Sequence, residues 1–234
     1  MTKPTGKHPV LYRCLPFALF MLFIGIEGFI RFLSDSGMIN PLPQASLLYL
    51  YPIKTVCVGL LLIYFREQYN EIRFAELANF RHLFFSIAVG IVVFILWINM
   101  DWSFGIQKQT ENFNPIILSD YLTRSTLIIF RIFGAAVVVP IMEELFWRSW
   151  LLRYLINNDF TQVPIGSFTW SSFLISIVLF GSEHNYILAG IMAGTAYSLL
   201  LYRTKSIIHC VTAHAVTNLS LGIYVVITQK WYFW

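Results

Sequence analysis

Long apolar runs follow one another along almost the whole chain, and they constrain its fold more than any other feature. A helix needs about 20 mostly apolar residues to cross a bilayer. The runs are 15–33, 45–65, 82–102, 124–140, 141–156, 168–182, 186–202 and 206–228. We therefore expect an all-α, polytopic membrane helix bundle of about seven to eight transmembrane helices, with residues 1–234 forming a single integral membrane domain.

Composition and charge exclude other classes of protein. The chain is 57% hydrophobic and 12% charged, whereas a soluble domain carries about 25% charged residues. Its net charge is +4, but the 16 Lys and Arg are scattered between the apolar runs. That pattern is typical of orientation by the positive-inside rule and not of a nucleic-acid surface. We expect an integral membrane protein with a cytoplasmic N-terminus.

The number of crossings depends on residues 124–156. If they form one crossing with a break at Pro140, seven spans result, and Arg203 and Lys205 lie on the cytoplasmic side. If 141–156 cross separately, eight spans result and both cations lie outside. Charge favours seven spans. We favour eight, because eight spans bring the polar residues of the candidate site to one side.

Some charged residues within the runs have a structural interpretation. Glu27 and Arg31 are four residues apart, which is the spacing of neighbours on one helix face, so we expect a structural ion pair. Lys54 and Arg131 lie near the ends of their runs. We expect both to extend towards the membrane interface, and we assign no chemistry to them.

The segment around Glu143, Glu144 and Arg148 is different, because it places two carboxylates and a guanidinium in an otherwise apolar run. On a helix, Glu144 and Arg148 can pair, while Glu143 points about 100° away. Glu143 is left without a partner, and a buried, unpaired carboxylate is suited to accept a proton as a general base. The alternative is a purely structural charge network.

Two further segments supply imidazole and amide groups. His184 ends one apolar run, while His214 and Asn218 lie one turn apart in the last run. Burial of such groups without partners costs several kcal/mol, so we expect them to point inward towards polar groups. Together with Glu143, they are the groups needed to activate a water molecule and to stabilise an oxyanion.

Three motifs, in this order, resemble those of the CPBP family, which contains the CAAX proteases and bacteriocin-processing enzymes. They are E-E-x-x-x-R at 143–148, F-x-x-x-H at 180–184 and H-x-x-x-N at 214–218. The chain resembles a bacterial relative of the Ras-converting CAAX endopeptidase, and more weakly the CAAX-protease-related group associated with exosortases. The resemblance covers about residue 124 to the C-terminus, with a catalytic core at 124–228.

The resemblance implies an intramembrane glutamic endopeptidase of the bacterial inner (cell) membrane that cleaves a membrane-associated protein or peptide. It implies that Glu143 and His184 activate water and that His214 and Asn218 stabilise the oxyanion. It also implies that Glu144, Arg148 and Phe180 organise the site. We expect no cofactor.

The sequence leaves three alternatives open. A zinc-dependent version of the protease would bind the metal between Glu143, His184 and His214. A non-catalytic immunity or scaffold protein of the same fold is the second alternative. A transporter with Glu27, Arg131 and Glu143 along its path is the third.

Overall fold

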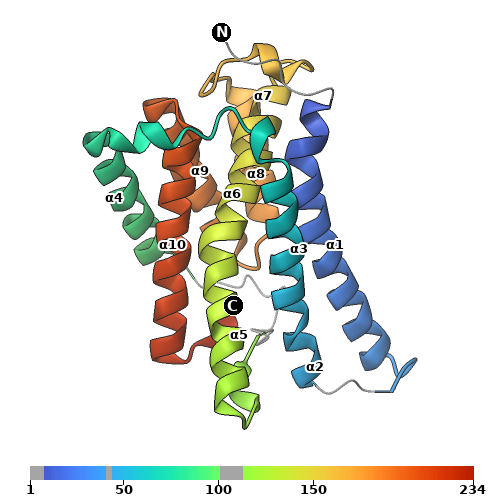
Figure 1. The fold of residues 1–234 in the computed structure, drawn as a ribbon. Helices are drawn as coiled ribbons and strands as arrows, with labels where there is room; N and C mark the ends of the chain where they lie inside the picture. Colours follow the sequence, from blue (N-terminus) through green and yellow to red (C-terminus); the bar gives the residue numbers. More distant parts are fainter. Residues whose placement is uncertain (1–7, 41–43, 101–112) are drawn as a thin grey trace.

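The computed structural model describes residues 8–40, 44–100 and 113–234, and within them the chain is helical without strands. The helices run along a common direction and pack side by side as a bundle (Figure 1). The α-helices are α1 (Pro9–Asp35), α2 (Gln44–Leu48), α3 (Leu50–Tyr64), α4 (Phe80–Trp97), α5 (Tyr121–Phe133), α6 (Val139–Glu144), α7 (Leu152–Tyr154), α8 (Trp170–Ser182), α9 (Ile187–Thr204) and α10 (Ile207–Thr228). The predicted all-α bundle is confirmed; the end of the third predicted run, Trp102, lies outside the described residues.

Within the described part of the chain, five helical segments are long and apolar enough to cross a membrane. They are Pro9–Asp35, Ala45–Tyr64, Phe80–Trp97, Tyr121–Tyr154 and Ile207–Thr228, and α8 is a shorter apolar helix. Large apolar side chains cover the outside of the bundle; Leu60, for example, is 62% exposed and Phe84 76% exposed. A surface of this kind suits contact with lipid rather than with water. The protein is an integral membrane protein.

Residues 121–154 form one continuous 34-residue helical segment, because two π-helical stretches join α5, α6 and α7. The predicted break at Pro140 is absent. Proline lacks an N–H and crowds the preceding turn, and the π-helical stretch Gly134–Val138 immediately before it accommodates this. Residues 141–156 are therefore not separated from 124–140, as the eight-span alternative required.

The basic residues that we used to count spans gather at one end of the bundle. The Lys205 ammonium donates to the carbonyl of Gly166, and Ser206 donates to Glu76 in the connection between α3 and α4. The end of α9 thus lies beside that connection, which also carries Arg66 and Arg73. This is the placement of Arg203 and Lys205 that the seven-span alternative predicted.

Small residues bring α8 and α9 together. A Cβ added to Gly190 would lie 2.8 Å from the Cα of Gly181, so the two backbones are almost in contact. A Cβ on Gly194 would lie 3.1 Å from the ring of Phe180. Close backbone approach is the usual role of such residues between membrane helices.

A buried ion pair joins α1 to the connection between α3 and α4. The guanidinium of Arg13 donates to both carboxylate oxygens of Glu71, each at 2.7 Å. Ser149 also donates to Glu71, and Arg153 donates to the Ser149 hydroxyl at 2.9 Å. Burial alone would raise the pKa of Glu71, but the hydrogen bonds and charge of Arg13 outweigh burial and lower it.

We expect this pair to make stability depend on pH. Because the pKa of Glu71 is lowered on folding, its stabilisation is complete above the unfolded pKa, about 4.3, and is lost as pH falls through the folded pKa. Glu71→Gln should lower the free energy of unfolding by about 3 kcal/mol at pH 7, because it leaves Arg13 buried without its counter-ion. Thermal unfolding in detergent at pH 7 and pH 4 measures both effects. The parent should lose more stability than Glu71→Gln between pH 7 and pH 4. If both proteins lose the same amount over this range, the predicted pH dependence is wrong.

Candidate active site

The two adjacent carboxylates lie in different environments, as helical spacing predicted. Glu144 is fully buried, and its Oε1 accepts from Arg148 at 3.1 Å. Glu143 points elsewhere, and its buried Oε2 has no hydrogen-bond partner among the described residues. That oxygen lies 3.9 Å from Nε2 of His214. Glu143 is therefore the carboxylate available to a ligand.

His214 closes a buried network that connects α6 with α10. Its Nδ1 lies 2.9 Å from the same Oε1 of Glu144 that Arg148 contacts. The ring of Tyr197 stacks on the imidazole, with 4.9 Å between centroids. The Tyr197 hydroxyl in turn donates to Thr217 at 2.8 Å. The expectation that His214 points inward at a polar group is confirmed.

Arg148 is held from three directions, and its side chain is 1% exposed. Besides its contact with Glu144, it donates to the carbonyl of Gly194 at 3.4 Å. Its guanidinium carbon lies 4.3 Å from the ring centroid of Phe180, a favourable cation–π distance. Phe180 thus connects the charge network to the helix that carries His184.

His184 follows the short helix α8, and this explains how it enters the bundle interior. Thirteen residues span about 20 Å, less than the roughly 30 Å of the hydrocarbon core. The Nδ1 of His184 lies 2.7 Å from the carbonyl of Phe180. Since a carbonyl only accepts, Nδ1 carries the proton and Nε2 is left as an acceptor. No separate crossing by residues 141–156 is needed to bring His184 to Glu143.

Asn218 contacts the backbone of the π-helical stretch that precedes Pro140. Its amide donates to the carbonyl of Ala135 at 2.8 Å. Pro140 cannot donate to a carbonyl one turn earlier, and side chains commonly satisfy backbone groups at such irregular turns. The second amide hydrogen of Asn218 is available to a ligand in the cavity that Asn218 lines.

Glu183, next to His184, bonds to Trp147, whose indole donates to its carboxylate at 3.1 Å. Ligand atoms of Glu143, Glu183 and His184 lie within 4.8 Å of one another, a spacing that suits a metal ion. His214 does not belong to this group, so the set differs from the one expected from the sequence. The same oxygen and nitrogen atoms suit a water molecule equally well.

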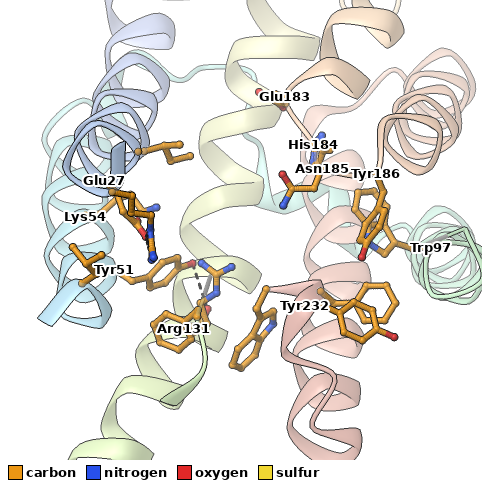
Figure 2. Close-up of a pocket in the computed structure, with 17 residues that line it drawn as sticks. Glu27, Tyr51, Lys54, Trp97, Arg131, Glu183, His184, Asn185, Tyr186 and Tyr232 are labelled. Atoms are coloured by element: carbon orange, nitrogen blue, oxygen red, sulfur yellow. Dashed lines mark hydrogen bonds and ion pairs between the residues drawn. The ribbon is translucent and has the colours of Figure 1, made fainter. Parts of the chain in front are cut away.

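A cavity of about 240 Å³ joins these groups, lined by Glu143, His184, His214 and Asn218. A second space of about 400 Å³ shares His184 and Arg131 with it and is drawn in Figure 2. In Figure 2, Lys54 and Arg131 face this space across from His184. Lys54 is only 6% exposed, so the prediction that it extends to the interface was wrong.

Several residues of the site were not identified from the sequence. Tyr197, Trp147 and Trp97 contact the predicted site residues directly; the Trp97 ring, for instance, lies 5.3 Å from that of His184. Aromatic residues are frequent in this chain, so nothing in the pattern separates them from lipid-facing ones.

The part of the chain that carries most of this site matches a known protein family. Residues 125–220 match the family model Rce1-like, described as type II CAAX prenyl endopeptidase Rce1-like. The matched segment contains all three motifs and supports, in general terms, a CAAX-type intramembrane endopeptidase, a hydrolase that acts on membrane-associated proteins. No curated protein and no solved structure matches the chain.

We expect Glu144→Gln to lower the free energy of unfolding by about 3 kcal/mol, because Arg148 would remain buried with reduced charge compensation. Glu144→Gln/Arg148→Met should cost less than the sum of the two single substitutions, because the double variant leaves neither charge alone. Thermal unfolding of the four proteins in one detergent tests the coupling. Strictly additive losses would show that the pair does not act as a unit.

Proposed function

We propose that Glu143 and His184 activate a water molecule for attack on a peptide bond. The observation that carries this proposal is that Glu143, with its free oxygen, and His184, with its acceptor nitrogen, line one cavity and have ligand atoms within 4.8 Å of each other. A water molecule between them donates one hydrogen to the Glu143 carboxylate and the other to Nε2 of His184. Its lone pair is then directed at the scissile carbonyl.

His214 and Asn218 stabilise the oxyanion that forms when the water oxygen bonds to the carbonyl carbon. The amide hydrogen of Asn218 that is not used by Ala135 donates directly. A protonated His214 keeps Nδ1–H on Glu144 and donates through Nε2. The charges then balance, because Arg148 and His214 compensate Glu143 and Glu144. Such pre-oriented donors contribute about 3 kcal/mol each to transition-state stabilisation.

Glu143 returns the proton taken from water to the leaving nitrogen, and the C–N bond breaks. The tetrahedral intermediate collapses to a carboxylic acid and an amine, so atoms and charge balance without a cofactor. In this scheme 124–228 is the catalytic core of a single membrane domain. The basic end of the bundle, which includes the start of α1, faces the cytoplasm by the positive-inside rule.

We expect Glu143→Gln and His184→Ala each to reduce cleavage by 10²- to 10⁴-fold, roughly the contribution of a positioned general base. Membrane-protein masses are compared between cells that produce the parent chain, each variant or no protein. Fragments that appear only with the parent identify the substrate. Asp159→Asn, in an exposed loop, is the matched control. Full cleavage by either site variant would overturn the proposal.

A metal-dependent version of the same hydrolysis is the second candidate, supported by the cluster of Glu143, Glu183 and His184. In the water mechanism, Glu183 only bonds to Trp147, so Glu183→Gln should retain at least about a tenth of the activity, since a neutral hydrogen bond is worth about 1 kcal/mol. Strong chelators should then have no effect. Loss of activity in Glu183→Gln together with chelator sensitivity and bound metal in elemental analysis would favour the metal.

A further inference from the structure

Two cations line the cavity, and the proposed hydrolysis uses neither of them. Lys54 of α3 and Arg131 of α5 line both the 240 Å³ cavity and the adjoining 400 Å³ space. No ion pair within 4.0 Å joins either side chain to an acid among the described residues. The buried Nε of Arg131 also has no hydrogen-bond partner there.

Aromatic rings hold these cations but do not neutralise them. The Lys54 nitrogen lies 4.9 Å, and the guanidinium carbon of Arg131 4.2 Å, from the centroid of the same Tyr51 ring. The Tyr51 hydroxyl is directed to the backbone carbonyl of Arg131, at 3.4 Å. Cation–π contacts offset part of the cost of desolvation, yet two like charges near one ring still repel each other.

The acids that line the 400 Å³ space are already engaged. Glu27 accepts from Arg31 at 2.8 Å, which confirms the predicted pair, and Glu183 accepts from Trp147 at 3.1 Å. Glu27 adds some attraction for Lys54 through space but does not pair with it. A carboxylate or another anion from outside would therefore complete this part of the cavity.

One helix face connects Arg131 to the proposed reaction centre. Arg131, Ala135, Val139 and Glu143 follow one another at intervals of four residues, and all line the same cavity. Arg131 and Glu143 are separated by about 18 Å of helix rise at 1.5 Å per residue. An extended peptide covers that distance with about five residues. One bound peptide can thus reach both places.

We propose that Lys54 and Arg131 form an anion subsite that binds a carboxylate of the substrate peptide, while the scissile bond lies at Glu143. The fork of Arg131 and the point charge of Lys54 match the two oxygens of a carboxylate. The subsite rests on the proposed function for its occupant, because only a peptide that reaches Glu143 extends along this face. The bound carboxylate comes from the chain terminus of the substrate or from one of its acidic side chains.

Binding to the full chain in the Glu143→Gln background tests the subsite without turnover. The probes are an N-acetylated pentapeptide of alternating leucine and alanine with a free terminal carboxylate, its terminal amide, and the amide with a final aspartate. Calorimetry in a neutral detergent compares this background with added Lys54→Met/Arg131→Met. Lys230→Met, an exposed cation outside the cavity, is the matched control. Replacing unpaired buried charges by apolar side chains of similar size should preserve the fold, which thermal unfolding verifies.

We expect the free acid to bind at least about tenfold more tightly than the amide, as charged hydrogen bonds imply. The preference should vanish in the double variant and persist in the control. Tight binding of the aspartate probe would assign the side chain as an accepted source; its failure would assign the terminus. Equal binding of acid and amide, or a preference that survives the double variant, overturns the proposal. The proposal is also overturned if acid and amide bind equally while phosphatidylglycerol binds more tightly than phosphatidylcholine and this lipid preference is lost in the double variant. Cleavage by Glu143→Gln would instead refute the hydrolytic mechanism and leave this result standing.

Discussion

The buried contact of Glu144 with Arg148 and His214 is the interaction on which the rest of the site depends. It joins the long 121–154 helix to α10, and through the Gly194 carbonyl it also fixes α9. Ions in an apolar interior are stable only when paired and hydrogen-bonded. Because Glu144 takes both partners, the buried Oε2 of Glu143 has no hydrogen bond among the described residues, and the Glu143 carboxylate is left for chemistry. The structural acid Glu144 and the proposed catalytic acid Glu143 are adjacent in sequence, so their side chains point about 100° apart around the helix axis.

The backbone around this network is irregular for a related reason. The π-helical stretch Gly134–Val138 precedes Pro140, and the stretch Leu145–Leu151 contains Arg148. A π-turn widens the helix and rotates the residues that follow, so side chains can be directed at neighbours that a regular α-helix would miss. Asn218 then bonds to the carbonyl of Ala135 in the first stretch. The irregular turns and the candidate site are therefore parts of one arrangement.

The local features could be predicted from the sequence and the long-range ones could not. Apolar run lengths located the helices, and a spacing of four predicted the Glu27–Arg31 and Glu144–Arg148 pairs, because these depend only on helix geometry. The position of His184 depends on where a 13-residue helix ends inside the bundle. Lys54 was assigned to the interface because its distance from the end of an apolar run does not reveal which helix packs over it. Its burial depends on α1, whose Phe20 ring lies 4.3 Å from the ammonium nitrogen.

The same reasoning separates two kinds of charge inside this bundle. Charges that stabilise the fold, such as Arg13 with Glu71 and Arg148 with Glu144, have partners supplied by the chain itself. Among the described residues, Lys54 and Arg131 form no ion pair within 4.0 Å, and the buried Oε2 of Glu143 has no hydrogen bond; all three side chains line one cavity. Leaving a charge unpaired in a low-dielectric interior is costly, and the cost is recovered when a ligand supplies the missing dipole or counter-charge. A peptide offers both, with a carbonyl to be attacked at Glu143 and a carboxylate for the cations, so the unpaired charges together outline the path of a substrate.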